Sequence, residues 1–124
     1  MALVDTSVLI HILEGTKKGI FIADEYEYDL VAITAISVNE VLRGTPRNKR
    51  EEVVRFLLDF KILSLDAKAA LKSVEIEDEL CARGKPLSKP DLFIAAISLV
   101  HDLPLLTMDR DFESVPSLKL LMPP

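Results

Sequence analysis

The sequence predicts a single α/β domain with a short, mainly parallel sheet. Short apolar runs alternate along the chain with segments of helical spacing, which is typical of βαβ units. The chain of 124 residues suits one hydrophobic core, and a composition of 49% hydrophobic and 28% charged residues indicates a globular protein. Since no repeat, low-complexity tract or internal linker interrupts the pattern, we expect one domain over residues 1–124.

The expected strands and helices follow one another in regular order. Apolar runs predict buried strands at residues 3–4, 30–33, 62–65, 105–107 and 118–121. Helical spacing predicts helices around Val8 and Ile12 and over residues 17–28, 36–42, 49–60, 67–83 and 90–101. Gly84 is placed to end the amphipathic fifth helix. Pro90 is placed to begin the nearly all-apolar sixth helix, which we expect to be buried on most faces.

Charge and cysteine content restrict the kind of site. A net charge of −5 argues against a broad non-specific nucleic-acid surface, but it is compatible with a nuclease whose metal ions bridge acidic residues to phosphate. Cys81 is the only cysteine, which excludes an internal disulfide and a Cys-rich zinc site, and we expect it to be a buried apolar residue. The apolar runs are too short to cross a bilayer and the N-terminus lacks a signal-peptide pattern, so we expect a cytoplasmic protein without a membrane segment.

Four acidic residues are expected at the edge where parallel strands end. Asp5 and Asp109 follow strands, Asp91 lies in the first turn of the sixth helix, and Glu40 lies nearly two turns into the third. Each has an ordinary explanation as a helix cap, a dipole partner, a turn residue or a solvated side chain. Carboxylates gathered at one edge, however, stay ionised together only when a cation neutralises them. Donor sets made of oxygen alone favour Mg²⁺ or Mn²⁺.

Hydroxyl groups flank these acids. Thr6, Ser7 and Thr107 can donate hydrogen bonds to the carboxylates and fix their orientation, as supporting residues do around metal sites. His11 and His101 fall within predicted helices, and we expect both to be ordinary helix residues.

Four motifs span essentially the whole chain in the order LVDTSVLI, SVNEVLRG, KPDLFIAA and LLTMDRDF. Together they resemble the PIN-domain ribonucleases, and among them the VapC-type toxins of prokaryotic toxin–antitoxin pairs. The resemblance implies a three-layer α/β/α sandwich and Mg²⁺- or Mn²⁺-dependent cleavage of RNA. It implies that Asp5 and Asp91 ligate metal and that Glu40 is the third acid of the site. Asp109 is the favoured fourth acid, with Asp111 as the alternative.

Two basic segments are expected to contact RNA phosphates. The segment RGTPRNKR follows Glu40 closely and contains no acidic residue, and two lysines come just before Asp91. Ordinary solvated loops are the alternative explanation. The residues concerned are Arg43, Arg47, Lys49, Arg50, Lys85 and Lys89.

An apolar segment is a candidate for partner binding. Residues 17–28 carry more apolar surface than one helix face needs, so we expect them to form a homodimer contact, to receive an antitoxin peptide, or to pack in the core. The apolar and aromatic residues concerned are Ile20, Phe21, Ile22, Tyr26 and Tyr28.

Three other functions were weighed against the ribonuclease. A haloacid-dehalogenase-type phosphatase needs a second Asp two residues after Asp5, where this chain has Ser7. A response-regulator receiver needs an acidic pair after the first strand and an Asp after the third, which Asp66 imitates only loosely. A catalytically silent PIN-like module that binds RNA or protein is the remaining alternative.

Overall fold

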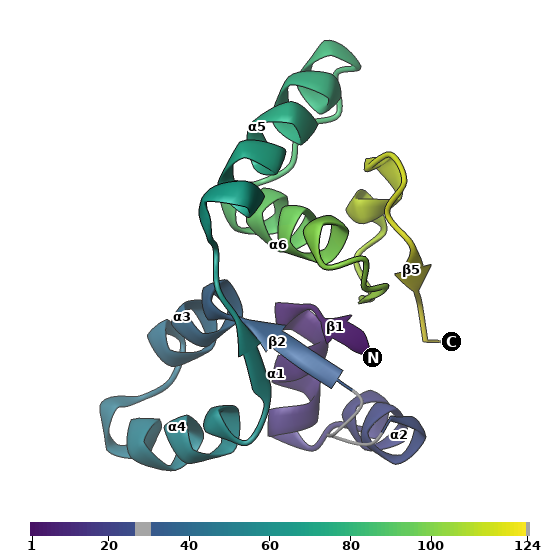
Figure 1. The fold of residues 1–124 in the computed structure, drawn as a ribbon. Helices are drawn as coiled ribbons and strands as arrows, with labels where there is room; N and C mark the ends of the chain where they lie inside the picture. Colours follow the sequence, from purple (N-terminus) through teal and green to yellow (C-terminus); the bar gives the residue numbers. More distant parts are fainter. Residues whose placement is uncertain (27–30, 124) are drawn as a thin grey trace.

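A computed structural model describes residues 1–26 and 31–123 and confirms the predicted α/β class (Figure 1). Its five-stranded sheet has the order β3-β2-β1-β4-β5, and every pair of neighbours is parallel. The strands are β1 (Ala2–Val4), β2 (Val31–Thr34), β3 (Lys61–Leu63), β4 (Leu105–Leu106) and β5 (Leu120–Leu121). The apolar runs in the sequence predicted all five strands. Tyr28 and Leu30, which belong to a predicted helix and a predicted strand, lie outside the described residues.

The strand order reverses beside the central strand, β1. From β1 the chain builds β2 and β3 on one side of the sheet and then returns to build β4 and β5 on the other. Val4 at the end of β1 pairs with Leu106 at the end of β4, so these two strands finish level with each other. Ligands of parallel α/β sheets bind where the strand order reverses in this way, at the carboxyl ends of the strands. The residues that come next, Asp5 and Thr107, therefore stand at the expected binding edge.

Helices cover both faces of the sheet and give three layers, as expected (Figure 1). Leu3 packs with α5 and α6 on one face, whereas its neighbour Val4 packs with α1, α2 and α4 on the other. This alternation buries both faces of a parallel sheet, which explains the continuous apolar strands. The helices are α1 (Thr6–Glu14), α2 (Lys17–Glu25), α3 (Ala35–Arg43), α4 (Arg50–Leu58), α5 (Ala67–Ala82) and α6 (Lys89–Val100), with short 3₁₀ turns η2 (Arg47–Lys49) and η3 (Arg110–Ser114).

Helix α6 is buried on most faces, as its sequence predicts. Four successive residues, Ile94 to Ile97, are fully buried between α5 and the sheet. The Ser88 hydroxyl caps the helix by accepting a hydrogen bond of 3.4 Å from the amide of Asp91. The buried helix therefore holds its first turn, which carries Asp91, in place. His101 is the C-cap residue of the helix.

Helix α5 corrects the expectation for Cys81, which is exposed and not buried. The helix buries Ala69, Ser73, Ile76 and Leu80, a spacing of three and four residues that defines a single face. Cys81 follows Leu80 by one residue, which turns its side chain about 100° away from that face. The prediction was wrong because it relied on the usual burial of cysteine and ignored the helical phase. Gly84, at φ 68°, follows the helix in the left-handed conformation, as expected.

Helix α2 packs closely against α1 and leaves apolar side chains outside. A side chain at Gly19 would come within 2.0 Å of the carbonyl oxygen of His11, so the two backbones touch at this crossing. Ile22 is buried, whereas Ile20 is 54% and Phe21 is 45% exposed. Core packing therefore accounts for only part of this apolar segment.

None of the helices in the described residues is long and apolar enough to span a membrane.

Candidate active site

Asp5 is a buried carboxylate at the carboxyl end of the central strand. It is only 3% exposed, and it also forms the N-cap of α1. Its Oδ1 accepts a hydrogen bond of 2.7 Å from the Thr6 amide, while its Oδ2 accepts from the hydroxyls of Ser7 (3.1 Å) and Thr107 (2.8 Å). Burial raises the pKa of Asp5, the hydrogen bonds oppose this, and the Asp109 charge adds to it. The N-cap explanation of Asp5 is therefore confirmed, and the capping carboxylate stands at the edge of the sheet where a site residue is expected.

Thr107 links Asp5 to the loop that carries Asp109. While its hydroxyl donates to Asp5, the same oxygen accepts a hydrogen bond of 3.0 Å from the Asp109 amide. Asp109 in turn caps η3, because its Oδ1 accepts from the Asp111 amide at 2.9 Å. Asp109 is half-buried and its charge acts on Asp5, whereas Asp111 is exposed. This arrangement favours Asp109 as the fourth acid.

Glu40, on α3, is connected to the same edge by hydrogen bonds between hydroxyl groups. The Thr6 hydroxyl donates to Glu40 Oε1 at 2.8 Å and lies 2.8 Å from the Ser37 hydroxyl. Ser37 is fully buried and is held by Thr34, whose Oγ1 accepts from the Ser37 amide at 3.0 Å. Ser37 was not among the site residues predicted from the sequence. Its signal was the spacing of three residues from Glu40, which places both side chains on one face of α3.

Asp91 completes the acidic group from the first turn of α6. Burial, together with the charges of Asp5, Asp109 and Glu40, raises the pKa of Asp91 to about 6, although the hydrogen bond with Ser88 opposes this shift. The other three acids that the sequence singled out are therefore near enough for their charges to act on Asp91, and they come from the end of β1, from α3 and from the loop after β4. The four acids are called the acidic site below.

The donor chemistry of the acidic site fits a hard divalent cation. All of its charged groups are carboxylates, and its neighbours are hydroxyls, which are oxygen donors as well. Within residues 1–26 and 31–123, no three His, Cys, Asp or Glu side chains are grouped so that they could hold an ion together. Binding an ion would require some of these side chains to turn toward one another.

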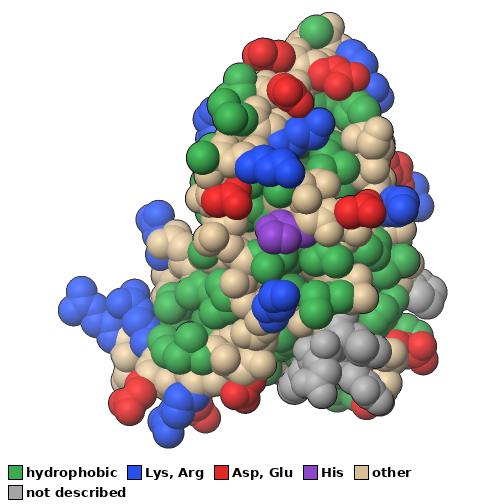
Figure 2. All heavy atoms as spheres, viewed as in Figure 1, with side chains coloured by type: hydrophobic (Ala, Val, Ile, Leu, Met, Phe, Trp, Pro, Cys, Tyr) green, Lys and Arg blue, Asp and Glu red, His purple; other side chains and the backbone are tan. Residues whose placement is uncertain are grey.

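The two basic segments differ in their surroundings. Arg43, Arg47 and Lys49 are exposed where α3 leads into α4, and Figure 2 shows Lys and Arg side chains gathered on this side of the molecule. Lys89 forms an ion pair of 3.0 Å with Glu77, which offsets its charge. Lys85 lines a groove of about 300 Å³ together with Asp111. The segment after α3 therefore offers the stronger positive charge.

A parallel sheet with helices on both faces and acidic residues at its switch point defines an α/β domain with a candidate site at the carboxyl ends of its strands. The family model for the PIN domain matches residues 2–118, and the chain belongs to this family. The resemblance drawn from the four sequence motifs is thereby confirmed.

Relatives of known name agree with this assignment. Ribonuclease VapC of Rickettsia bellii is 30% identical over 98% of this chain and 96% of its own length. Ribonuclease VapC1 of Methanocaldococcus jannaschii is 29% identical over 87% of this chain and 75% of its own length. These relatives match the chain along most of their lengths, so the similarity is not confined to one motif.

Solved structures share the fold. A toxin–antitoxin complex from Klebsiella pneumoniae contains a chain with a TM-score of 0.80 and 28% identity, and 95% of each chain is covered. DNA-bound VapBC from Salmonella typhimurium gives a TM-score of 0.84 at 22% identity over 98% of both chains, which supports the fold alone.

Proposed function

We propose that this protein is a metal-dependent endoribonuclease that hydrolyses RNA phosphodiester bonds, and that it is the toxin of a toxin–antitoxin pair. The observation that carries the proposal is the buried Asp5 carboxylate, which shares the switch-point edge with Asp91, Asp109 and Glu40. Burying such a group is unfavourable unless a partner compensates its charge. Relatives named ribonuclease VapC support the reaction, and the similar toxin–antitoxin complex supports the biological role.

The acidic site supplies the ligands for Mg²⁺ or Mn²⁺. Asp5 and Asp91 are assigned as metal ligands, while Glu40 and Asp109 hold a second ion or orient the attacking water. A bound divalent ion activates water and stabilises charge on the reacting phosphate. Ser7 and Thr107 hold Asp5, and Thr6 holds Glu40, so the hydroxyls keep the carboxylates oriented before substrate arrives.

The basic residues are assigned to the RNA backbone. Exposed guanidinium and ammonium groups beside an acidic site attract phosphates and place one of them over the acids. The assigned residues are Arg43, Arg47, Lys49, Arg50, Lys85 and Lys89.

The exposed apolar residues of α2 are assigned to a protein partner. Ile20 and Phe21 are about half exposed beside the buried Ile22, and exposed apolar surface of this kind favours association. The proposed occupants are an antitoxin peptide and a second copy of the chain. The similar toxin–antitoxin complex from Klebsiella pneumoniae supports the first.

Cleavage of a fluorescent single-stranded RNA tests the function. The wild type is expected to cut the RNA in Mg²⁺ or Mn²⁺ and to be inactive in excess EDTA. Asp5→Asn should be inactive in every buffer, whereas Asp78→Asn, an exposed acid on α5, should match the wild type. RNA binding without metal-dependent cleavage would indicate the catalytically silent module instead.

A further inference from the structure

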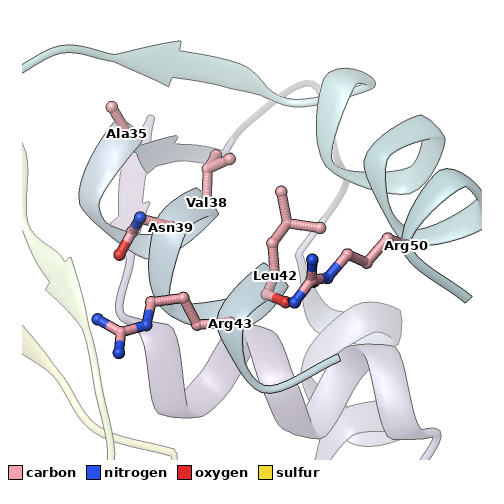
Figure 3. Close-up of a pocket in the computed structure, with 6 residues that line it drawn as sticks. All are labelled: Ala35, Val38, Asn39, Leu42, Arg43 and Arg50. Atoms are coloured by element: carbon pink, nitrogen blue, oxygen red, sulfur yellow. Dashed lines mark hydrogen bonds between the residues drawn. The ribbon is translucent and has the colours of Figure 1, made fainter. Parts of the chain in front are cut away.

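A groove lies on α3, the helix that also carries Glu40 (Figure 3). It has a volume of about 380 Å³, within the range of pockets that hold small ligands. Among the described residues that line it, none is acidic and two are arginines. The lining residues are Ala35, Val38, Asn39, Leu42 and Arg43 of α3 and Arg50 of α4.

Helix geometry places the groove next to Glu40. Residues of an α-helix follow one another at about 100°, so Arg43 lies about 60° from Glu40 around the axis of α3. Asn39 lies about 40° further round in the same direction. Among the lining residues of α3, Arg43 is therefore the nearest to Glu40 around the helix axis, and a chain crossing α3 from Glu40 meets Arg43 first and Asn39 next.

The groove combines an apolar floor with fixed polar groups at its rim. Val38 and Leu42 are half-buried and present aliphatic surface. The Nε of Arg50 donates to the carbonyl oxygens of Leu42 (3.2 Å) and Thr45 (3.3 Å), so its guanidinium is anchored at the rim. In Figure 3, Asn39 and Arg43 extend on one side of α3, while Arg50 reaches toward Leu42 from α4.

We infer that this groove is a subsite for one unpaired nucleobase of the RNA, next to the cleaved phosphate, and that Asn39 selects the base. This inference rests on the proposed function and adds a determinant of sequence preference to it. The flat face of a base packs on aliphatic and guanidinium surface, while an asparagine amide both donates to and accepts from the base edge. Arg43 and Arg50 contact the flanking phosphates.

Charge favours RNA over a protein segment as the occupant. The chain has a net charge of −5, yet residues 43–50 contain four cationic side chains and no acid. Figure 2 shows hydrophobic and basic side chains next to each other on the α3 and α4 side of the molecule. A positively charged surface on a protein of net negative charge suits a polyanion such as RNA.

RNA binding tests the subsite separately from catalysis. The probes are short fluorescent oligo(A), oligo(U) and oligo(C), measured by anisotropy in EDTA with the full chain. Asn48→Ala is the control for Asn39→Ala, because Asn48 is exposed but does not line the groove. Arg55→Ala, an exposed arginine further along α4, is the control for Arg43→Ala.

The wild type is expected to prefer one homopolymer, with oligo(A) the favoured probe because asparagine pairs best with adenine. Asn39→Ala should reduce that preference about tenfold, whereas Asn48→Ala should retain it. Arg43→Ala should weaken binding to all three probes and lower the salt dependence by about one counterion, unlike Arg55→Ala.

Three outcomes would overturn the subsite. The first is RNA binding with a base preference that Asn39→Ala leaves intact. The second is a wild type that binds none of the probes. The third is a change of oligomeric state on light scattering in Asn39→Ala or Arg43→Ala, which would make the groove a protein interface. Base-selective binding without cleavage in Mn²⁺ would refute the proposed nuclease while leaving the subsite in place.

Discussion

The Thr107 hydroxyl donates a 2.8 Å hydrogen bond to the Asp5 carboxylate, and this bond joins residues 102 positions apart in the sequence. Both side chains are buried, and the bond connects the ends of two adjacent strands, β1 and β4. Because the same oxygen also accepts from the Asp109 amide, one hydroxyl fixes two acids of the site.

Removing the Thr107 hydroxyl should lower the stability of the fold. Thr107→Val keeps the shape of the side chain but removes one of the three hydrogen-bond donors to the buried Asp5 carboxylate, so we expect a loss of about 1.5–3 kcal/mol in the free energy of unfolding. Thr45→Val is the control, because it removes a neutral bond to the Val41 carbonyl and should lose less. Urea unfolding measures both, and equal small losses would show that Thr107 is not supporting a charged group.

The raised pKa of Asp91 predicts the pH dependence of stability. Native Asp91 binds its proton up to about pH 6, whereas the unfolded chain releases it near 3.8. The native state therefore holds more protons between these values, and the Asp91 contribution lowers stability as pH rises through this window. In EDTA at pH 7.5, Asp91→Asn should melt several degrees above the wild type, and the difference should vanish near pH 4. Asp78→Asn should show no such pH-dependent difference.

Divalent ions should reverse this effect. Mn²⁺ should raise the melting temperature of the wild type at pH 7.5, because an ion that binds only the native state stabilises it. Protons compete for Asp91, so the Mn²⁺-induced shift should shrink as the pH falls from 7.5 to 5. Thermal melts at several Mn²⁺ concentrations measure the shift. A shift of the same size in Asp91→Asn would mean that the ion binds elsewhere.

Thr6 should act through Glu40. Thr6→Val removes the 2.8 Å bond to Glu40, and we expect RNA cleavage to fall about 10- to 100-fold, as is usual for residues that support metal ligands. Thr6→Ser keeps the hydroxyl and should restore most of the rate. The Mn²⁺ dependence of the rate should move to higher concentration in Thr6→Val only. If serine and valine lower the rate equally, the hydroxyl is not the active feature.

The close crossing of α1 and α2 predicts a purely structural effect. Gly19→Ala would place a carbon 2.0 Å from the His11 carbonyl oxygen, so the two helices must separate, at about 1–3 kcal/mol of stability. Gly44→Ala is the matched control, since its nearest neighbours would lie 3.7 Å away. Chemical denaturation of the two variants should differ accordingly, and equal stabilities would mean that α2 shifts freely on α1.

Much of this architecture could be predicted from the sequence, because its determinants are local. The buried strands are continuous apolar runs, and Asp5, Asp91 and Asp109 follow strands or begin a helix at positions that a parallel sheet brings to one edge. Other features depend on tertiary contacts. The burial of Ser37 depends on its contact with Thr6, from another helix, so its role had only a weak signal in the spacing.

The prediction for Cys81 failed for a different reason. Average burial of cysteine was applied to a residue whose position on α5 is set by helical phase. The sequence left Asp111 as an alternative to Asp109, because two acids in one turn look alike. In the structure the Asp109 amide donates to the Thr107 hydroxyl, and Asp109 stays the proposed fourth acid.

The single-turnover rate of RNA cleavage in Mn²⁺ by Asp91→Asn, compared with Asp78→Asn, tests the central claim most directly. A site that uses Asp91 to hold the ion should lose about a thousandfold or more, since the charge stabilisation involved is several kcal/mol and each decade of rate corresponds to about 1.4 kcal/mol. Asp78→Asn should retain the wild-type rate. An Asp91→Asn rate within tenfold of the control would contradict the account.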